Sequence, residues 1–235
     1  MEPYDSLDWR LPYLTEALPG IGGEIRTVPE DFIVNEVPVY EPCGEGEHTF
    51  FRVEKREITT PALVRQVAQA LGISPRDVGS AGRKDKYAVA RQTLSVWNVP
   101  PEQLMDLDLE NARVLWAKRH TNKLRIGHLL GNRFTLRIRD VHPEAEARAG
   151  AILDVLARRG VPNGYGRQRF GNRGDNDKIG LALVRKDWDV LDWRGIHNPS
   201  YGQRRFYVNA LQSALFNRVL TVRMREETMD DLLSG

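Results

Sequence analysis

The stretch Phe134-Thr135-Leu136-Arg137-Ile138-Arg139 alternates apolar and polar residues without a break, and residues 143–159 follow it with a helical composition. Strict alternation predicts a β-strand whose apolar side chains, at 134, 136 and 138, share one face. We therefore expect Arg137 and Arg139 to lie side by side on the accessible face. The stretch marks the point where strand-like sequence gives way to helix-like sequence.

Strand-like segments precede this point and helix-like segments follow it. β-branched and aromatic residues predict strands over 32–37, 49–54, 92–99 and 112–117. One helix opens early, at Thr60-Pro61, where we expect Thr60 to cap it and Gly72 to end it. Later helices are predicted over 143–159, 177–188 and 209–227, whereas glycine and proline make 1–28 and 79–82 irregular. This order predicts an α+β fold, with a sheet domain over 1–159 and a mostly helical region over 160–235.

The composition is that of an ordinary soluble protein, with 41% hydrophobic and 28% charged residues. No run of about eighteen apolar residues is present, and the acidic start lacks the features of a secretory signal. We therefore expect a cytoplasmic protein. The single cysteine, Cys43, excludes an internal disulfide and a zinc site built from cysteines.

Charge is distributed unevenly along the chain. Residues 1–50 carry eleven acidic and two basic side chains, a net charge of −9, which leaves +11 for residues 51–235 because the total is +2. Residues 111–139 hold eight lysines and arginines and no acid. Such basic stretches suit a surface that neutralises phosphates, but they also suit a solvated face whose charges pair with the acidic N-terminal part.

The segment Ser80-Ala81-Gly82-Arg83-Lys84-Asp85-Lys86-Tyr87-Ala88 places one carboxylate between cations in a loop that begins with glycine. Nearby positive charges favour the ionised form of an acid, and an ionised, partly dehydrated carboxylate can act as a nucleophile or a base. The alternative is a surface turn with adjacent charges. Asp85 is therefore a candidate catalytic residue.

Three other clusters combine glycine, aromatic residues and arginine. They are 131–134 (GNRF), 163–172 (NGYGRQRFGN) and 201–207 (YGQRRFY). Aromatic rings stack on unpaired bases and guanidinium groups bind phosphates, so this mixture suits RNA. For any one cluster, a tight turn anchored by a buried ring is an equal alternative. Three clusters in one basic chain favour RNA.

Several well-known sites are missing from the sequence. It contains no P-loop and no GxGxxG motif followed by an acid, so nucleotide cofactors find no support. Its five histidines never take HExxH or other metal-binding spacing, and GxSxG is absent too. We expect neither a metal nor a small-molecule cofactor.

Together the motifs resemble the TruD family of tRNA pseudouridine synthases. The resemblance runs through five ordered segments: 28–32 (VPEDF), 44–48 (GEGEH), 81–89 (AGRKDKYAV), 131–136 (GNRFTL) and 161–171 (VPNGYGRQRFG). It implies a mixed, mainly antiparallel sheet of the pseudouridine-synthase kind with flanking helices in a catalytic domain, 1–159. Residues 160–235 would then be the beginning of a helical insertion domain.

The resemblance also implies the chemistry. The aspartate of its A-G-x-K-D motif, here Asp85, acts on the ribose C1′ of a flipped uridine, so that the base can reattach through C5. Phe134, from G-N-x-F, is expected to stack on the target base with Asn132 beside it. Lys84 and Arg26 fall where the family places basic groups. The activity is an isomerase reaction, and the implied target is uridine 13 of tRNA.

We expect the tRNA partner to contact basic side chains along the chain, and we expect a monomer that does not bind membranes. The candidate RNA-binding residues are Arg83, Lys86, Lys118, Arg119, Lys123, Arg125, Arg167 and Arg169. Family members return to their first domain through a C-terminal segment with an L-x-x-P-x-x-x-Y/F-A-T pattern, which these 235 residues lack. A noncatalytic RNA-binding module, or an inactive fragment of such an enzyme, is therefore the alternative function. A metal-dependent nuclease is disfavoured because no carboxylates cluster to hold two ions.

Overall fold

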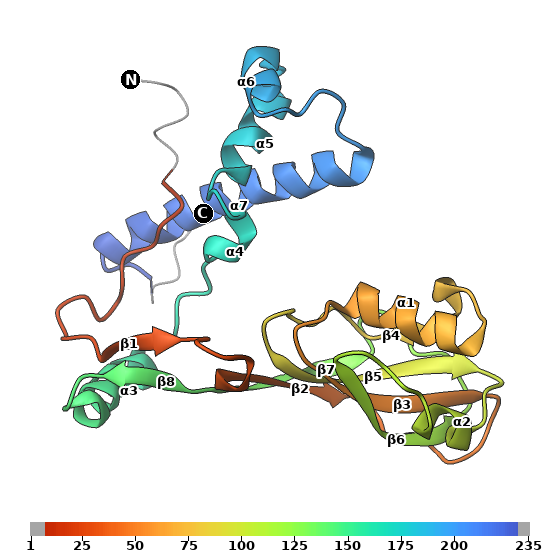
Figure 1. Cartoon of the computed structure of the whole chain (residues 1–235). Coiled ribbons are helices and arrows are strands. Elements are labelled where there is room, and N and C mark those ends of the chain that lie inside the picture. Colours follow the sequence, from red (N-terminus) through yellow and green to blue (C-terminus); the bar gives the residue numbers. More distant parts are fainter. Residues whose placement is uncertain (1–7, 230–235) are drawn as a thin grey trace. The chain divides into compact units, whose positions relative to one another are not determined.

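A computed structural model describes residues 8–229, which form two compact units (Figure 1). We call residues 22–143 the sheet unit, and residues 8–21 with 144–229 the helical unit. The predicted α+β class is confirmed. The predicted domain boundary after Arg159 falls inside the helical unit, because helix α3 (Ala145–Arg159) belongs to it. The outer ends of both predicted domains, residues 1–7 and 230–235, lie outside the described residues.

The sheet unit contains a six-stranded mixed sheet in the order β6-β3-β5-β2-β7, with the short β4 also paired to β5. β2 and β5 are parallel, and the other pairs in this sheet are antiparallel. The four strands predicted before residue 120 are confirmed with small shifts of their ends. The bounds are β2 Phe32–Pro38, β3 His48–Lys55, β4 Gly79–Ser80, β5 Val89–Trp97, β6 Ala112–His120 and β7 Leu129–Leu136.

The prediction of one continuous strand over 134–139 is wrong. β7 ends at Leu136, and β8 (Ile138–Val141) pairs with β1 (Gly22–Ile25) in a separate two-stranded sheet. Asp31 causes the break, since its carbonyl accepts a hydrogen bond from the Arg137 N–H at 2.8 Å. Its carboxylate accepts two more, at 2.7 and 2.8 Å, from the guanidinium of Arg139. Arg139 is therefore fixed on a buried acid and does not stand free beside Arg137.

β1 also lies in a region predicted to be irregular. Gly22 and Gly23 both have a positive φ, of 67° and 99°, which glycine adopts without strain. A Cβ atom on Gly23 would lie 2.7 Å from the carbonyl oxygen of Arg139, too close for any other residue. The glycines that argued against a strand are what allow β1 to approach β8.

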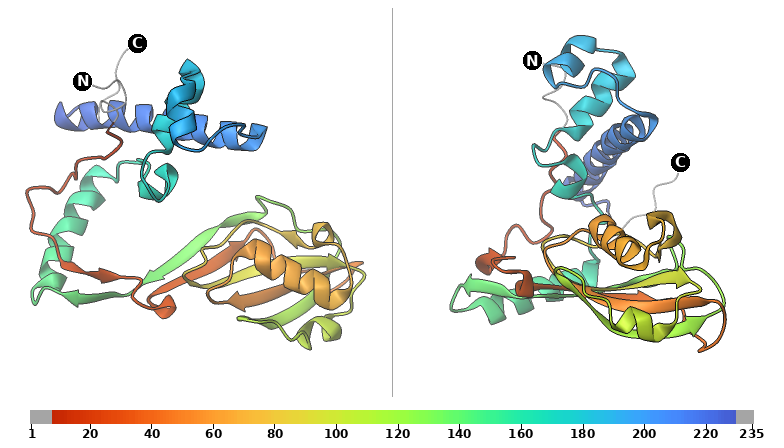
Figure 2. Two further views of the ribbon diagram at one scale, coloured as in Figure 1. Left: turned by 45° about the horizontal axis from the view of Figure 1, so that its top comes forward. Right: turned by 45° about the vertical axis from the view of Figure 1, so that its right-hand side comes forward.

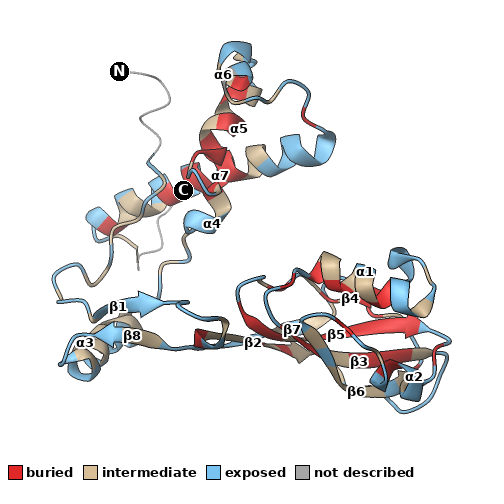
Figure 3. Ribbon diagram, in the orientation of Figure 1, coloured by how far each residue is buried: buried red, intermediate tan, exposed pale blue. Residues whose placement is uncertain are grey.

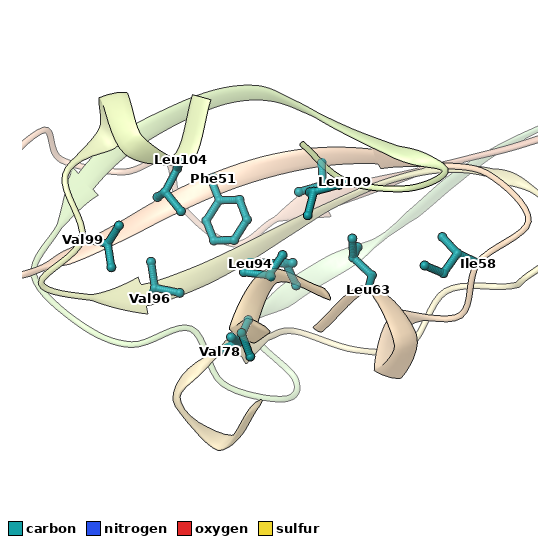
Figure 4. Packing of buried hydrophobic residues seen from close by; sticks show 12 residues of the cluster. Phe51, Ile58, Leu63, Val78, Leu94, Val96, Val99, Leu104 and Leu109 are labelled. Atoms are coloured by element: carbon teal, nitrogen blue, oxygen red, sulfur yellow. The ribbon is translucent and has the colours of Figure 1, made fainter. Parts of the chain in front are cut away.

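Helix α1 (Thr60–Leu71) lies along one face of the six-stranded sheet in both views of Figure 2. Its side chains Leu63 and Val67 are completely buried in one core cluster with Phe51, Val53 and Leu94 of β3 and β5. Figure 4 shows Leu63, Phe51 and Leu94 in this cluster. Helix α2 (Pro101–Met105) was not predicted and adds Leu104 to this core. Burying each large apolar side chain contributes about 1.5–3 kcal/mol. Figure 3 shows the contrast between buried β3 and β5 and the exposed strand β1.

The N-cap of α1 is Thr59 and not the predicted Thr60. The hydroxyl of Thr59 accepts a hydrogen bond from the Ala62 N–H at 3.3 Å. Thr60 is buried and used elsewhere, because its hydroxyl accepts from the Lys84 N–H and donates to Gln92. The first turn of α1 therefore touches the loop that carries Asp85.

The helical unit contains α3, α4 (Arg167–Phe170), α5 (Asn176–Arg185), α6 (Trp188–Trp193) and α7 (Tyr201–Arg225). The predicted helix over 177–188 ends earlier, and the one predicted to begin at 209 begins at Tyr201 after a capping box at Ser200. The cluster 201–207 is therefore helical rather than a turn. Gly180 lets α5 approach α7 closely, since a Cβ there would lie 2.3 Å from the Tyr207 carbonyl oxygen. Over residues 8–229, the structure contains no helix long and apolar enough to span a membrane.

Candidate active site

Asp85 lies in the loop between β4 and β5, at the end of the sheet where β3 ends and β2 and β5 begin (Figure 1). Its side chain is 27% exposed, so a substrate can reach the carboxylate. The Nη2 atom of Arg26 lies 3.7 Å from its Oδ2 atom. Arg26 precedes β2 and has a positive φ of 60°. Two predicted site residues, 59 positions apart in the sequence, are thus brought together.

Lys84 points the other way, into the protein. Its Nζ atom lies 2.6 Å from Oε2 of Glu36, and these side chains are only 3% and 2% exposed. Lys84 is therefore buried, whereas the adjacent Asp85 is accessible. Lys86 lies over the ring of Tyr87, 5.1 Å from its centroid. The cation paired with Asp85 is therefore Arg26 and not its sequence neighbours.

Lys55, the last residue of β3, lies beneath the loop and was missed from the sequence. It is completely buried, and its Nζ atom donates hydrogen bonds to the carbonyl oxygens of Asp85 at 2.6 Å and Ile58 at 2.7 Å. Burial lowers the pKa of Lys55 to about 8, since a charge is costly away from water. The attraction of Asp85 opposes this shift, and the charge of Lys84 adds to it.

Phe134 and Asn132 lie in β7, opposite Val34 and Glu36 of β2. The ring of Phe134 is 60% exposed and stacks on Phe32, with 5.9 Å between ring centroids and 6° between planes. The guanidinium carbon of Arg26 lies 4.2 Å from the centroid of the Phe32 ring. Phe32, also missed from the sequence, connects the predicted stacking residue to the cation that pairs with Asp85. An exposed aromatic ring of this kind can stack on a nucleobase.

A sequence signal for the missed charges exists. Phe51, Val53 and Lys55 occupy alternate positions of one strand, as do Phe32, Val34 and Glu36 of another. A charge that continues an apolar alternation points into the core, and buried charges are paired or functional. The same rule applied to the sequence would have selected both Lys55 and Glu36.

The predicted RNA-binding residues are not all close to Asp85. Arg83 and Lys86 are exposed in its own loop. Lys118 of β6 lies opposite Phe50 of β3, five positions from Lys55, or roughly 17 Å along the strand. The remaining predicted residues lie as follows: Arg119 is opposite Thr49, Lys123 donates to the Arg76 carbonyl, Arg125 is exposed, and Arg167 and Arg169 belong to α4.

The other face of the sheet carries a polar hollow of about 500 Å³ that the sequence did not predict. Arg52, Arg91 and Arg133 line it together with Trp116. Arg91 is held by the buried carboxylate of Glu54, with its Nε 2.9 Å from Oε2. Three arginines converge here from three different strands, so only the folded sheet brings them together.

The described part of the chain contains no cluster of side chains that could bind a metal ion. Among residues 8–229, no group of three or more histidine, cysteine, aspartate or glutamate side chains is placed to hold an ion. The chemistry that the described site offers is that of one accessible carboxylate, a guanidinium group and an exposed ring.

Comparison with known proteins identifies the family. The sequence matches the profile described as tRNA pseudouridine synthase D (TruD) over residues 10–201. The chain belongs to the TruD family. It is 40% identical over 278 aligned positions to the tRNA pseudouridine synthase D of Geobacter sulfurreducens, covering 95% of this chain and 68% of that protein. It is 52% identical to the one of Geobacter metallireducens, covering 75% of this chain and 44% of that protein.

The fold agrees with a solved TruD structure. A crystal structure of a Methanosarcina mazei protein assigned as tRNA pseudouridine synthase D superposes with a TM-score of 0.72 at 26% identity, covering 97% of this chain and 65% of that one. The predicted resemblance to TruD is therefore confirmed. The chain spans 44–56% of the length of several of the curated TruD proteins that it matches.

Proposed function

We propose that this chain carries the catalytic centre of a tRNA pseudouridine synthase, an isomerase that converts uridine to pseudouridine. The observation that supports this most is the accessible Asp85 carboxylate, held beside Arg26 at the end of the sheet. Phe134, exposed and linked to Arg26 through Phe32, supplies a stacking surface close by. Membership of the TruD family supports the same reading.

In the proposed reaction, Asp85 acts at the ribose C1′ while the N1–C1′ bond of uridine breaks. The detached base turns and forms a bond from C5 to C1′. The proton on C5 is lost and N1 gains a proton, so the product is an isomer of the substrate. The carboxylate supplies the negative charge that a nucleophile, or an electrostatic partner of a cationic sugar, requires. This route needs no metal or organic cofactor.

A base inside folded RNA must leave its stack before the sugar can be reached, at a cost of a few kcal/mol. Stacking on an aromatic side chain recovers about 1–3 kcal/mol per base. Phe134 is suited to this because most of its ring is already exposed. Arg83 and Lys86, exposed in the Asp85 loop, are the predicted phosphate contacts nearest to the carboxylate.

The substrate position follows from the family resemblance and is part of the proposal. Uridine 13 of tRNA is the expected target, and a cytoplasmic monomer is the expected form of the protein. Sequencing of modified tRNA by primer extension after chemical treatment of pseudouridine would map the position. Modification at another uridine would contradict only the assignment of uridine 13 as the target and would leave the proposed isomerase activity unaffected.

The test compares Asp85→Asn with the unmodified protein, using the complete translation product of the gene that encodes this chain. Pseudouridine in digested tRNA is measured by mass spectrometry, and tRNA affinity by gel shift. We expect Asp85→Asn to lose at least about 1000-fold in turnover while it still binds tRNA. Asp108→Asn, an exposed aspartate of the same unit, is the matched control.

The same assays distinguish the proposed enzyme from the alternative, a noncatalytic RNA-binding module. That alternative predicts tRNA binding by the unmodified protein without any pseudouridine formed. Turnover that survives in Asp85→Asn would contradict the catalytic role of Asp85, because this variant lacks the carboxylate.

A further inference from the structure

Lys55 is placed where the pattern of β3 calls for an apolar side chain. It follows Phe51 and Val53 on the face that packs against α1, and all three side chains are completely buried. A buried ammonium group costs several kcal/mol unless it is paired with an acid. Both hydrogen bonds that the structure gives to Nζ of Lys55 go to main-chain carbonyl oxygens. The charge therefore stabilises the fold less than an ion pair would.

The two carbonyls that Lys55 holds belong to different segments. Ile58 lies in the connection from β3 to α1, and Asp85 lies in the loop between β4 and β5. The lysine is thus a bridge from the rigid sheet and helix to the candidate catalytic residue itself. A neutral side chain of similar size would fill the space without this bridge.

The preceding residue is fixed from the same side. The Lys84 N–H donates to the hydroxyl of Thr60 at 2.9 Å, and its side chain pairs with Glu36. With Lys84 held at both ends and the Asp85 carbonyl held by Lys55, the backbone on both sides of the Asp85 Cα is anchored. The direction of the Asp85 side chain, toward Arg26 and the solvent, follows from this anchoring.

The charge of Lys55 also acts on Asp85. The ammonium and the carboxylate attract each other, as do Arg26 and the same carboxylate, whereas the charge of Lys84 is compensated by Glu36. Asp85 therefore has one cation on its exposed side and one beneath its main chain. Because the region around Lys55 is buried, this attraction is weakly screened by solvent.

We propose that Lys55 is a positioning residue for Asp85, holding the carbonyl of the catalytic residue and supplying a buried positive charge beneath its main chain. The inference rests on the proposed function. Lys55 does not touch the substrate, so it acts on the rate of the chemical step and not on the affinity for tRNA.

Lys55→Met and Lys55→Gln test the proposal in the complete translation product. Methionine fills the space without a donor, and glutamine keeps an N–H donor without the charge. For both we expect kcat to fall at least tenfold, with KM and the gel-shift affinity for tRNA within about twofold of the unmodified protein. Arg65→Met, which removes an exposed cation from α1, is the control and should leave kcat unchanged.

The pH profile distinguishes positioning from a purely structural role. In the unmodified protein, kcat should fall as pH rises through about 8, the pKa of Lys55, because its charge is then lost. The groups facing it are Asp85 and Lys84 from the loop, with Glu36 paired to Lys84 and Arg26 paired to Asp85. Lys55→Met should lack this fall, whereas Arg65→Met should keep it.

The outcomes separate the two proposals. An inactive unmodified protein would contradict the proposed function. An active protein that depends on Asp85, but keeps its kcat in a folded Lys55→Met variant, would overturn only the role of Lys55. If neither Lys55 variant folds, the profile of the unmodified protein decides, since a kcat that stays constant from pH 7 to 9.5 overturns the proposal.

Discussion

The Nζ atom of Lys84 lies 2.6 Å from Oε2 of Glu36, and both side chains are almost completely buried. In the sequence, Lys84 stands next to Asp85 and looks like its counterion. In the fold its ammonium group pairs instead with Glu36, which continues the buried apolar face of β2. The ion pair therefore anchors the loop between β4 and β5 to β2, and the counterion of Asp85 is Arg26.

Glu36→Gln should destabilise the protein by about 3–5 kcal/mol, because it leaves the buried ammonium of Lys84 without a charge partner. The other oxygen of Glu36 accepts a hydrogen bond from the Thr93 N–H, and an amide oxygen can still do so. Urea denaturation followed by circular dichroism measures the change. Glu110→Gln, an exposed glutamate, should change stability by less than about 0.5 kcal/mol. If Glu36→Gln also changed stability by less than about 0.5 kcal/mol, the ion pair between Lys84 and Glu36 would not contribute to stability.

Phe134→Ala should lower kcat/KM for tRNA by about 10–100-fold, the amount expected from losing one base-stacking contact. Stability should change little, because the ring is 60% exposed. Thr135→Ala, the next residue of β7 with its side chain on the opposite face, is the control. Equal activity of the two variants would remove Phe134 from the site.

Asp31 should make the protein sensitive to acid. The hydrogen bond from Arg139 holds the pKa of Asp31 below its usual value, against the opposing effect of burial. The unfolded chain then binds this proton more readily, so the stabilisation is complete above pH about 4 and is lost as pH falls through the folded-state pKa. At pH 7, Asp31→Asn should melt at a lower temperature than the unmodified protein. On acidification to pH 3, the melting temperature of Asp31→Asn should fall by less than that of the unmodified protein. Scanning calorimetry from pH 3 to 7 measures both, and parallel curves for the two proteins would contradict the prediction.

Lys55 should make the stability of the protein increase with pH in the alkaline range. Its pKa is about 8 in the folded protein and near 10.5 when unfolded, so the unfolded chain binds more protons between these values. The free energy of unfolding should therefore rise with pH in this window, relative to Lys55→Met, by an amount on the order of 1–3 kcal/mol. Urea titrations at pH 7.5, 9 and 10 test this. A constant difference between the two proteins would show that Lys55 titrates normally.

The first prediction about the fold failed where a contact between distant residues outweighed a local pattern. Residues 134–139 alternate as a single strand, yet Asp31 divides them by binding both Arg137 and Arg139. Glycines at 22 and 23 predicted irregular chain, but they begin β1, where only a glycine at position 23 fits against β8. Local propensity is a weak guide when a buried charge or a close backbone contact decides.

The sequence by itself determined the class of fold, the main strands, the first helix and the loop that carries Asp85. These depend on the alternation and spacing of residues within one segment, and burying one face of each element is enough to fix them. It also named Arg26, Asn132 and Phe134 through the resemblance to the TruD family. Only the tertiary structure decided the order of the strands and the partners of each charge. Arg26 with Asp85, Lys84 with Glu36 and Lys55 with the Asp85 carbonyl join segments 30 to 59 positions apart, and such contacts exist only once the sheet has brought those segments together.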